Sequence, residues 1–217
     1  MLYLIGMGLE QGDMSQKAQQ AISQADKVFV EAYTSIPYEF QAEKLDREQV
    51  ESDFLLKLAK KQDIVLLIAG DPLFATTHLS LFVEARKAGI ACQVIHASSI
   101  INAISRTGLS SYKFGRIVTL SKPFESDKEK IESNLKAGLH TLVLLDPIID
   151  MQDGLSILSQ FNIKSKLIAC ARLGTKTEMI KYALAAELEK IDFGDRPHCL
   201  IIPAKLQFFE QEFLELF

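Results

Sequence analysis

The sequence predicts an α/β fold, because short apolar runs that are typical of strands alternate with amphipathic patterns that are typical of helices. The clearest strand is the unbroken apolar run 64–69, which indicates a strand buried on both faces of a parallel sheet. A helical pattern over 79–89 follows it and ends at Gly89. This alternation predicts a largely parallel sheet.

The pattern of glycine and polar residues changes at 107–115, where Gly108 and Gly115 lie on either side of a short polar stretch. We expect a domain boundary there. It divides the chain into an N-terminal α/β domain, residues 1–113, and a C-terminal α/β domain, residues 114–217.

In the N-terminal half, each predicted strand is a short apolar run, and each predicted helix repeats its apolar residues every three or four positions. Ser98 or Ser99 is the expected cap of a helix that begins near Ile100, because a hydroxyl can accept a free N–H group of the first turn. We expect strands at 2–5, 28–31, 64–69 and 91–95, and helices at 15–25, 46–61, 79–89 and from about 100.

In the C-terminal half, Ser126 to Glu129 form a capping-box pattern that is expected to open a helix running to Gly138. The other elements follow from the same apolar spacing. We expect strands at 117–120, 141–145, 166–171 and 199–202, and helices at 126–138, 153–160, 177–190 and 207–217.

The composition is that of a globular protein, with 48% hydrophobic and 24% charged residues among 217. The formal charge of −4 argues against a broad nucleic-acid surface, which needs a basic face. No apolar run approaches the ~20 residues of a membrane span, and the apolar start lacks the basic segment of a signal peptide. Cys92, Cys170 and Cys199 lie far apart in strand-like runs, so we expect reduced core cysteines and a cytoplasmic protein.

A Gly-Asp-Pro turn directly follows the apolar run 64–69 and precedes a helix. In open α/β sheets, the carboxyl ends of the strands line the ligand crevice. Gly70 allows a ligand to approach the backbone, Pro72 fixes the turn, and the Asp71 carboxylate can accept hydrogen bonds from hydroxyl or ammonium groups. These residues predict a site for a nucleoside-like ligand that carries positive charge.

The Gly6-Met7-Gly8 segment after the first strand matches only the first part of a dinucleotide-binding fingerprint. The third glycine would fall at position 11, which is Gln11. We therefore favour a tight strand-to-helix turn over a pyrophosphate cradle.

The four histidines, His78, His96, His140 and His198, form no H-x-x-x-H pair and no cluster with cysteine at zinc-ligand spacing. We therefore predict no metal site. His96 is expected to end a strand and bond the backbone. His198 begins an apolar strand, where the residues alone favour a structural role over a functional one.

Further polar residues follow predicted strands. Asp146, taken alone, is more often a turn residue than a ligand. Arg172 belongs either to a surface ion pair or to a contact with a carboxylate or phosphate. The acidic and aromatic tail 208–217 is expected to be a helix packed on a core or a partner.

The sequence contains no G-x-S-x-G elbow and no Cys-His or Ser-His arrangement, so nothing indicates covalent catalysis. Direct group transfer between two bound substrates is favoured, and a protein promotes such a transfer mainly by positioning. The sequence identifies no catalytic base.

Several segments together form a recognisable set: LYLIGMGL from Leu2, EAYTS from Glu31, GDPLFATTH from Gly70, IHASSI from Ile95, TGL and YKFG within 107–115, and DFGD with PH within 192–198. In this order they resemble the diphthine synthase family over most of the chain. The resemblance implies the tetrapyrrole-methylase-like fold, in which two α/β domains bind S-adenosylmethionine in the cleft between them, usually as a homodimer. It also implies methylation of the amino group of a modified histidine on translation elongation factor 2, with S-adenosylhomocysteine as the product.

The resemblance further implies a set of cofactor contacts. It favours a functional role for His198 over the structural one, and it agrees with the independent interpretation of Asp71 as a ligand-binding residue. The implied contacts are Leu9, Asp71, Phe74, Ser99, Ile100, Leu145, Leu173 and His198.

The acceptor in this family carries an amine and a carboxylate, and we expect it near Tyr33, Thr34 and Arg172. As a hypothesis, the planar guanidinium of Arg172 pairs with that carboxylate and leaves the amine facing the sulfonium. The alternative is that Arg172 only braces the domain interface.

Two other functions stay open at this point. One is another methylase of the superfamily, acting on a corrinoid precursor or on ribosomal RNA, although the absence of an evident basic patch counts against RNA. The other is a catalytically silent module that binds S-adenosylmethionine, against which Asp71, Ser99 and His198 count. The high hydrophobic content for two small domains also predicts a homodimer.

Overall fold

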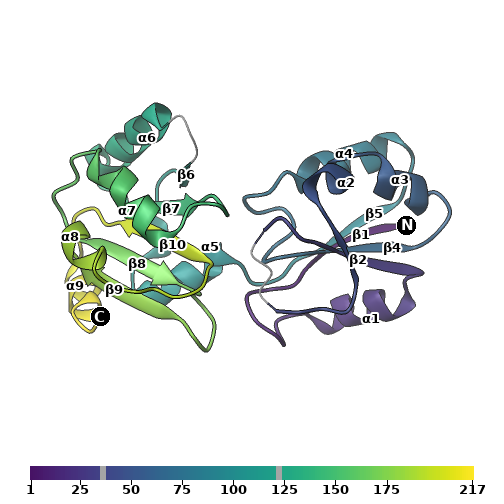
Figure 1. The fold of residues 1–217 in the computed structure, drawn as a ribbon, viewed down its shortest axis with the longest axis horizontal. Helices are drawn as coiled ribbons and strands as arrows, with labels where there is room; N and C mark the ends of the chain where they lie inside the picture. The colour runs from purple at the N-terminus through teal and green to yellow at the C-terminus, as the bar shows by residue number, and fades with distance from the viewer. Residues whose placement is uncertain (35–37, 121–123) are drawn as a thin grey trace. The chain divides into compact units, whose positions relative to one another are not determined.

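The computed structural model describes residues 1–34, 38–120 and 124–217. The chain forms two compact units, residues 1–102 and residues 103–217, and each unit contains one sheet (Figure 1). Each unit is an α/β structure, as predicted from the sequence.

The division into units falls earlier in the chain than the expected boundary after residue 113. Residues 103–113 belong to the second unit. Their attachment has a clear cause, because Lys113 O accepts the N–H of His140 at 2.7 Å and Gly115 N donates to His140 O at 2.9 Å. The polar stretch at 107–115 therefore lies inside the second unit.

The first unit has a five-stranded sheet of order β3-β2-β4-β1-β5, and all neighbouring strands are parallel, as predicted. The four predicted strands are confirmed, and the short edge strand β3 is an addition to them. The strands are β1 (Leu2–Gly6), β2 (Lys27–Glu31), β3 (Glu43–Leu45), β4 (Ile64–Ile68) and β5 (Cys92–Ile95).

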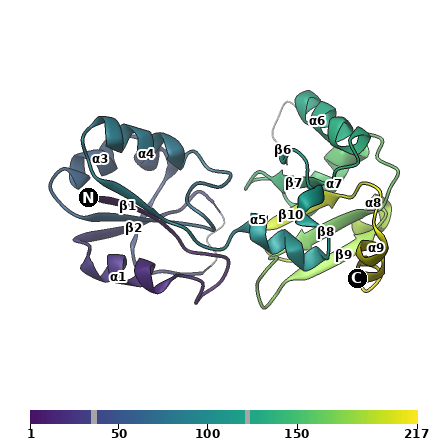
Figure 2. The ribbon, with the colours of Figure 1, turned by 180° about the vertical axis from the view of Figure 1, so that it is seen from behind.

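Helices cover both faces of this sheet (Figure 2). Side chains alternate along β1, so that Leu4 packs in the core formed with α3 and α4, whereas Ile5 packs in the core formed with α1. The helix predicted over 46–61 is split into α2 and α3, because Ser52 adopts an extended conformation and its hydroxyl donates to Gln49 O. The helices of this unit are α1 (Gln16–Gln24), α2 (Arg47–Glu51), α3 (Phe54–Ala59) and α4 (His78–Lys87), and the short α5 (Ile100–Ala103) crosses the division after residue 102.

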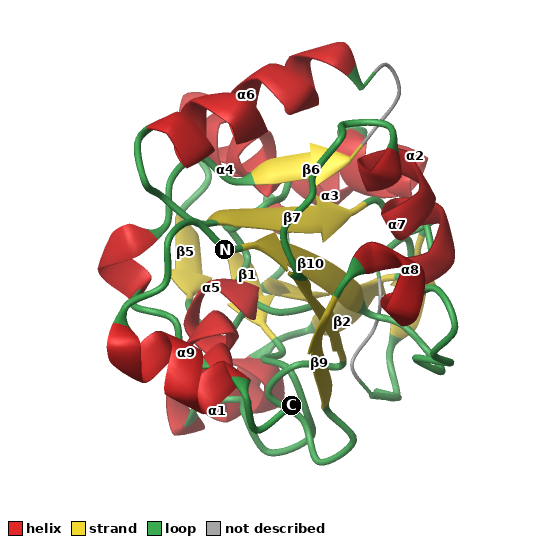
Figure 3. Ribbon diagram, turned by 90° about the vertical axis from the view of Figure 1, so that its left-hand side faces the viewer, coloured by secondary structure: helices red, strands yellow, loops and turns green. Residues whose placement is uncertain are grey.

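The second unit has a mixed sheet of order β6-β7-β10-β8-β9, in which only the β6–β7 pair is parallel among the described strands. Figure 3 shows this sheet with α6 beside β6 and β7. The strands are β6 (Val118–Leu120), β7 (Thr141–Leu145), β8 (Leu167–Ala171), β9 (Met179–Ala183) and β10 (His198–Ile202), and the helices are α6 (Glu125–Lys136), α7 (Met151–Ser159), α8 (Ala185–Leu188) and α9 (Phe208–Leu214).

One helix prediction for the second unit is wrong, and a second helix, expected at 126–138, is confirmed as α6 without its predicted cap. The stretch 177–190 forms β9 and the short α8, because Met179 to Ala183 pair antiparallel with β8 along its whole length. The capping box expected at Ser126 is absent from the described contacts, because α6 already begins at Glu125 and its cap position, Phe124, makes no side-chain cap. Pairing with β8 therefore decides the structure of 179–183, and the start of α6 at Glu125 places Ser126 inside the helix instead of at its cap.

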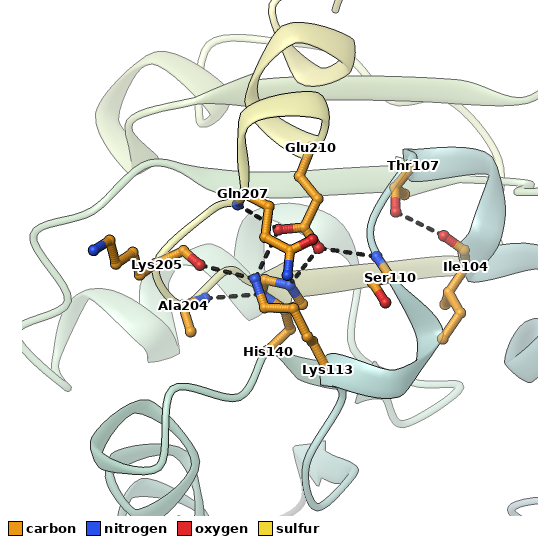
Figure 4. A network of polar contacts seen from close by, with 9 residues as sticks. All are labelled: Ile104, Thr107, Ser110, Lys113, His140, Ala204, Lys205, Gln207 and Glu210. Atoms are coloured by element: carbon orange, nitrogen blue, oxygen red, sulfur yellow. Dashed lines mark hydrogen bonds and ion pairs between the residues drawn. The ribbon is translucent and has the colours of Figure 1, made fainter.

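A buried carboxylate fastens α9 to the segment before β6 (Figure 4). Glu210 is 3% exposed, and its oxygens accept from Ser110 N at 3.0 Å, Gln207 N at 2.7 Å, Lys113 Nζ at 2.7 Å and His140 Nε2 at 3.2 Å. Burial alone would raise the pKa of Glu210, but these four donors hold it down to about 2. The predicted helix at 207–217 is thus confirmed, and an ionic network anchors it.

The three cysteines are free, and Cys170 and Cys199 lie in the core of the second unit. Within the described ranges, no helix combines the length and apolar character needed to cross a membrane. In the same ranges, no group of three or more His, Cys, Asp or Glu residues is placed to hold a metal ion.

Candidate functional site

The first unit has a topological switch point between β1 and β4. The connection from β1 leads to β2 on the far side of β4, whereas the connection from β4 leads to β5 on the far side of β1. In open α/β sheets, ligands bind outside the carboxyl ends of the strands at such a point. Gly8 and Gly70 exchange backbone hydrogen bonds here at 3.3 and 3.0 Å. The sheet therefore places both sequence-predicted loops at its ligand-binding edge.

The loop after β1 is a tight turn closed by a carboxylate. Gly8 has a φ of +76°, a conformation that favours glycine. Asp13 Oδ2 accepts from Leu9 N at 2.8 Å and from Glu10 N at 3.3 Å. Because Asp13 occupies these N–H groups, the loop has the character of the predicted turn rather than that of a pyrophosphate cradle.

Asp71 lies in the loop after β4 with its carboxylate held on two sides. Its Oδ1 accepts from Leu73 N at 3.0 Å, and its Oδ2 lies 2.7 Å from His96 Nδ1. The side chain of Asp71 is only 14% exposed. Each carboxylate oxygen has a second lone pair, so Asp71 can still accept from a ligand. The prediction that His96 bonds the backbone is wrong, because its ring nitrogen bonds this carboxylate.

Ser99 places an unpaired hydroxyl beside the same loop. It is 3% exposed, and its Oγ makes no hydrogen bond to any described residue. The expected side-chain cap by Ser99 is therefore not formed, and Asn102 N bonds the Ser99 carbonyl at 3.0 Å instead. A Cβ on Gly70 would lie 3.4 Å from Ser99 Cβ, so Gly70 and Ser99 are close neighbours at this end of the sheet. A buried unpaired hydroxyl is costly unless a ligand or water completes it.

The remaining expected contacts of the first unit, Leu9, Phe74 and Ile100, are half-buried and follow the carboxyl ends of β1, β4 and β5. The strand order places these ends side by side. The first unit therefore brings its five predicted cofactor contacts to one edge of its sheet.

The second unit gathers the other three predicted contacts at one edge of its own sheet. Leu145 ends β7, and Leu173 follows the end of β8. His198 begins β10, which runs antiparallel to both neighbours, and it pairs in register with Ala171. The start of β10 therefore lies at the same edge as the ends of β7 and β8.

His198 presents a hydrogen-bond acceptor at this edge. Its Nε2 donates to Gly194 O at 3.1 Å, so the proton of the neutral ring lies on Nε2. Its Nδ1 is buried and has no partner among the described residues. Burial lowers the pKa of His198, which favours the neutral ring. Nδ1 is therefore a lone pair available to a hydroxyl or amino group of a ligand.

Arg172 holds the loop that carries Leu173. Its backbone has a φ of +48°. Its Nε donates to Thr177 O at 3.1 Å, and its Nη1 donates to Phe193 O at 2.8 Å and to Asp195 O. The guanidinium is thus largely engaged with backbone carbonyls of its own unit.

Glu178 is a residue of this loop that the sequence analysis missed. It accepts from Gly174 N at 3.0 Å and from Arg106 Nε at 3.0 Å. The hydrogen bond from Arg106 lowers the pKa of Glu178. Arg106 and Glu178 are 72 residues apart in the chain, so no local sequence pattern predicts their ion pair. Asp146, by contrast, accepts from Ile148 N at 3.1 Å, as its turn interpretation predicts.

The predicted substrate residues Tyr33 and Thr34 lie beside two buried polar side chains, the Glu31 carboxylate and the His78 imidazole. Glu31 and His78 are each 1% exposed at the side chain, and Glu31 Oε2 lies 3.0 Å from His78 Nε2. Tyr33 Oη lies 3.0 Å from the same Nε2, and Thr34 Oγ1 donates to Glu31 Oε1. Burial, followed by the charge of Glu31, raises the pKa of the Tyr33 phenol. Sequence reasoning assigned no role to Glu31 or His78. Ser35, the last residue of that motif, lies outside the described residues.

These polar groups fit the expected cofactor. In the first unit, the Asp71 carboxylate suits ribose hydroxyls or an ammonium group, and Ser99 Oγ is buried with no partner among the described residues. In the second unit, considered by itself, His198 Nδ1 is a buried acceptor. The polar groups of the first unit therefore suit a nucleoside-like ligand that carries positive charge.

Comparison with known proteins points in one direction. Residues 1–189 match the family model of the Tetrapyrrole (Corrin/Porphyrin) Methylases. The chain is 36% identical to a diphthine synthase of Methanothermobacter thermautotrophicus, over 99% of this chain and 94% of that protein. It is also 36% identical to a diphthine synthase of Methanocaldococcus jannaschii, over 99% and 98%. A crystal structure of diphthine synthase superposes with a TM-score of 0.93 at 31% identity, covering 100% of this chain and 96% of the other.

Proposed function

Because the chain belongs to the tetrapyrrole (corrin/porphyrin) methylase family and, within it, is a methyltransferase of the diphthine synthase group, we propose that it methylates the amino group of the modified histidine of translation elongation factor 2. The methyl donor in this proposal is S-adenosylmethionine, and the product is S-adenosylhomocysteine. When bound, the cofactor supplies an electrophilic methyl group. We further propose a cytoplasmic homodimer.

One observation carries the cofactor assignment. The Asp71 carboxylate and the unpaired Ser99 hydroxyl lie at the carboxyl edge of a parallel sheet, beside its switch point. In the second unit, His198 Nδ1 adds a buried acceptor. We assign the apolar side chains of Leu9, Phe74, Ile100, Leu145 and Leu173 to cover the rest of the cofactor. These residues bind and orient the donor, and the acceptor must then be held as a free amine close to it.

The decisive experiment is mass spectrometry of elongation factor 2 that carries the unmethylated intermediate, after incubation with this protein and S-adenosylmethionine. We expect a mass gain of whole methyl groups on the modified histidine. An unchanged factor, together with methylation of a corrinoid precursor or of ribosomal RNA, would reject the proposed substrate in favour of another.

Asp71→Ala is expected to weaken binding of S-adenosylhomocysteine by roughly 10- to 100-fold, because loss of a charged acceptor costs about 1.5–3 kcal/mol. Calorimetric titration measures this affinity. Asp53→Ala is a suitable control, because Asp53 makes an exposed i,i+4 pair with Lys57 on α3. Equal affinities of the Asp71→Ala variant and the wild type would show that this carboxylate does not bind the cofactor.

Arg172→Ala is expected to lower stability and cofactor affinity together, because the carbonyls of Thr177 and Phe193 lose a charged donor, worth about 1.5–3 kcal/mol. Thermal unfolding and single-turnover rates should be measured on the same preparation. A variant with normal stability and normal cofactor affinity, but slow methyl transfer, would instead assign Arg172 to the carboxylate of the acceptor.

A further inference from the structure

The buried side chains of Glu31 and His78 have no assigned part in holding the cofactor. We propose that Tyr33, His78 and Glu31 form a proton relay that takes a proton from the acceptor amine. This inference rests on the proposed function, because it concerns the amine that is methylated. It names the base that sequence analysis left unidentified.

The geometry of the three groups is that of a relay. Tyr33 Oη is hydrogen-bonded to His78 Nε2 at 3.0 Å, and Glu31 Oε2 lies 3.0 Å from the same nitrogen. Glu31 Oε2 makes no hydrogen bond within the described residues, so the carboxylate acts on the imidazole through its charge. Tyr33 is half-buried, whereas Glu31 and His78 are closed off from solvent. Among the described residues, the Tyr33 phenol is the hydrogen-bonded link between His78 Nε2 and the partly exposed side of the site.

The position of the relay suits a substrate site. Glu31 ends β2, which is the neighbour of β4, and Tyr33 follows it at the same carboxyl edge that carries Asp71. The loop after β4 runs from Asp71 to His78, the first residue of α4. The cofactor-binding carboxylate and the imidazole of the relay are thus the two ends of one short loop.

The side chains around Glu31 and His78 are mostly acidic. From α2, Arg47 lies over the Tyr33 ring at 5.3 Å and pairs with Glu51 at 3.4 Å. A small cavity beside His78 is also lined by Glu51 and by Glu84 of α4. Glu31, Glu51 and Glu84 place negative charge around the ring, and Arg47 places one positive charge there. His78 Nδ1 is buried without a partner among the described residues, so it can hold the second imidazolium proton or accept a bond.

The acceptor amine must be deprotonated before it can be methylated. An aliphatic amine is mostly protonated at neutral pH and must lose a proton before its lone pair can attack. The amine proton passes to Tyr33 Oη while the phenol proton passes to His78 Nε2, and the Glu31 carboxylate offsets the resulting positive charge. The free lone pair then forms the new nitrogen–carbon bond, and the electron pair of the broken carbon–sulfur bond stays on sulfur. The raised pKa of the phenol keeps Tyr33 protonated, as a relay group must be.

Tyr33→Phe tests the relay with little change in shape. We expect kcat to fall about 100-fold at pH 7, the lower range for general acid–base catalysis, with unchanged affinity for S-adenosylhomocysteine. The loss should shrink as the pH rises toward the pKa of the free amine, because water then removes the proton. Tyr182→Phe is the matched control, since Tyr182 stacks under Lys166 on β9 of the second unit. A loss that stays constant with pH, or no loss, would overturn the relay.

A second measurement does not depend on turnover. The ring nitrogens of His78 are followed by ¹⁵N NMR at a pH of about 8.5, where an ordinary histidine is neutral, and are assigned with His78→Gln. Binding of the unmethylated acceptor in the presence of S-adenosylhomocysteine should give the imidazolium pattern in the wild type and not in Tyr33→Phe. A neutral His78 in both proteins would reject it as the proton acceptor.

The two proposals fail in different ways. A wild-type protein that leaves the unmethylated elongation factor unchanged contradicts the proposed function and, with it, the relay. A wild-type protein that methylates the factor at the same rate as Tyr33→Phe contradicts the relay alone.

Discussion

Glu210→Ala is expected to lower the free energy of unfolding by about 3–5 kcal/mol, the range for removing one partner of a buried ion pair. The substitution leaves the Lys113 ammonium and the His140 ring without their shared acceptor. It also strips a partner from the N–H groups of Ser110 and Gln207. The result should be a second unit whose last helix detaches first.

Because of Glu210, we also expect the free energy of unfolding to decrease at acid pH. The pKa of Glu210 is about 2 in the folded chain against an ordinary 4.5, so the folded state binds fewer protons. Glu210 therefore stabilises the fold fully above pH 4.5, by roughly 3 kcal/mol, and this contribution is lost as the pH falls from 4.5 toward 2. Burial lowers the pKa of His140, so protonation of His140 below its ordinary 6.5 weakens the fold in the same direction.

Urea unfolding at pH 7 and at pH 3 measures both effects. Glu212→Ala is the matched control, because Glu212 lies on the same helix and faces solvent. The difference between wild type and Glu210→Ala should be large at pH 7 and smaller at pH 3. A Glu210→Ala variant as stable as Glu212→Ala would show that the network contributes nothing to folding.

Gly6→Ala is expected to destabilise the first unit by about 3 kcal/mol, the upper part of the range for overpacking, and to weaken S-adenosylhomocysteine binding more than tenfold. A Cβ at this position would lie 2.4 Å from Gly70 O and 2.8 Å from Ala97 Cβ. The carbonyl is backbone and cannot rotate away. It must shift, and it carries the turn of Asp71 with it.

Chemical unfolding and calorimetric titration on Gly6→Ala separate the two consequences. Gly138→Ala is the control, because a Cβ there meets nothing within 4 Å and only its φ of +73° opposes the change. That control should cost about 1–2 kcal/mol without altering cofactor affinity. Normal affinity in Gly6→Ala would mean that the Asp71 turn does not depend on this close approach.

The part of the site that the sequence predicts rests on local signals. The apolar run that became β4 is followed at once by Gly70 and Asp71, so chain order alone places the carboxylate at the carboxyl end of a buried strand. His198 could be placed at a strand start in the same way. Its position at the ligand edge required the antiparallel direction of β10, which the βα alternation did not indicate.

The parts that the sequence does not predict depend on long-range contacts. Tyr33 and His78 are 45 residues apart, and Glu210 reaches His140 and Ser110 over 70 and 100 residues. The sequence pattern over 177–190 is compatible with a helix as well as with a strand. Pairing with β8 makes residues 179–183 a strand, β9. No window of neighbouring residues contains these partners.

The anchoring of α9 has a consequence for the order in which the chain is made. The first unit draws its contacts from residues 1–102, so it can fold while translation of the second continues. Ser110 and Lys113, in contrast, must wait about a hundred residues for their carboxylate partner. During that interval Ser110, Lys113 and His140 lack the carboxylate to which they bond in the folded chain, so this network forms only after the last residues have been translated.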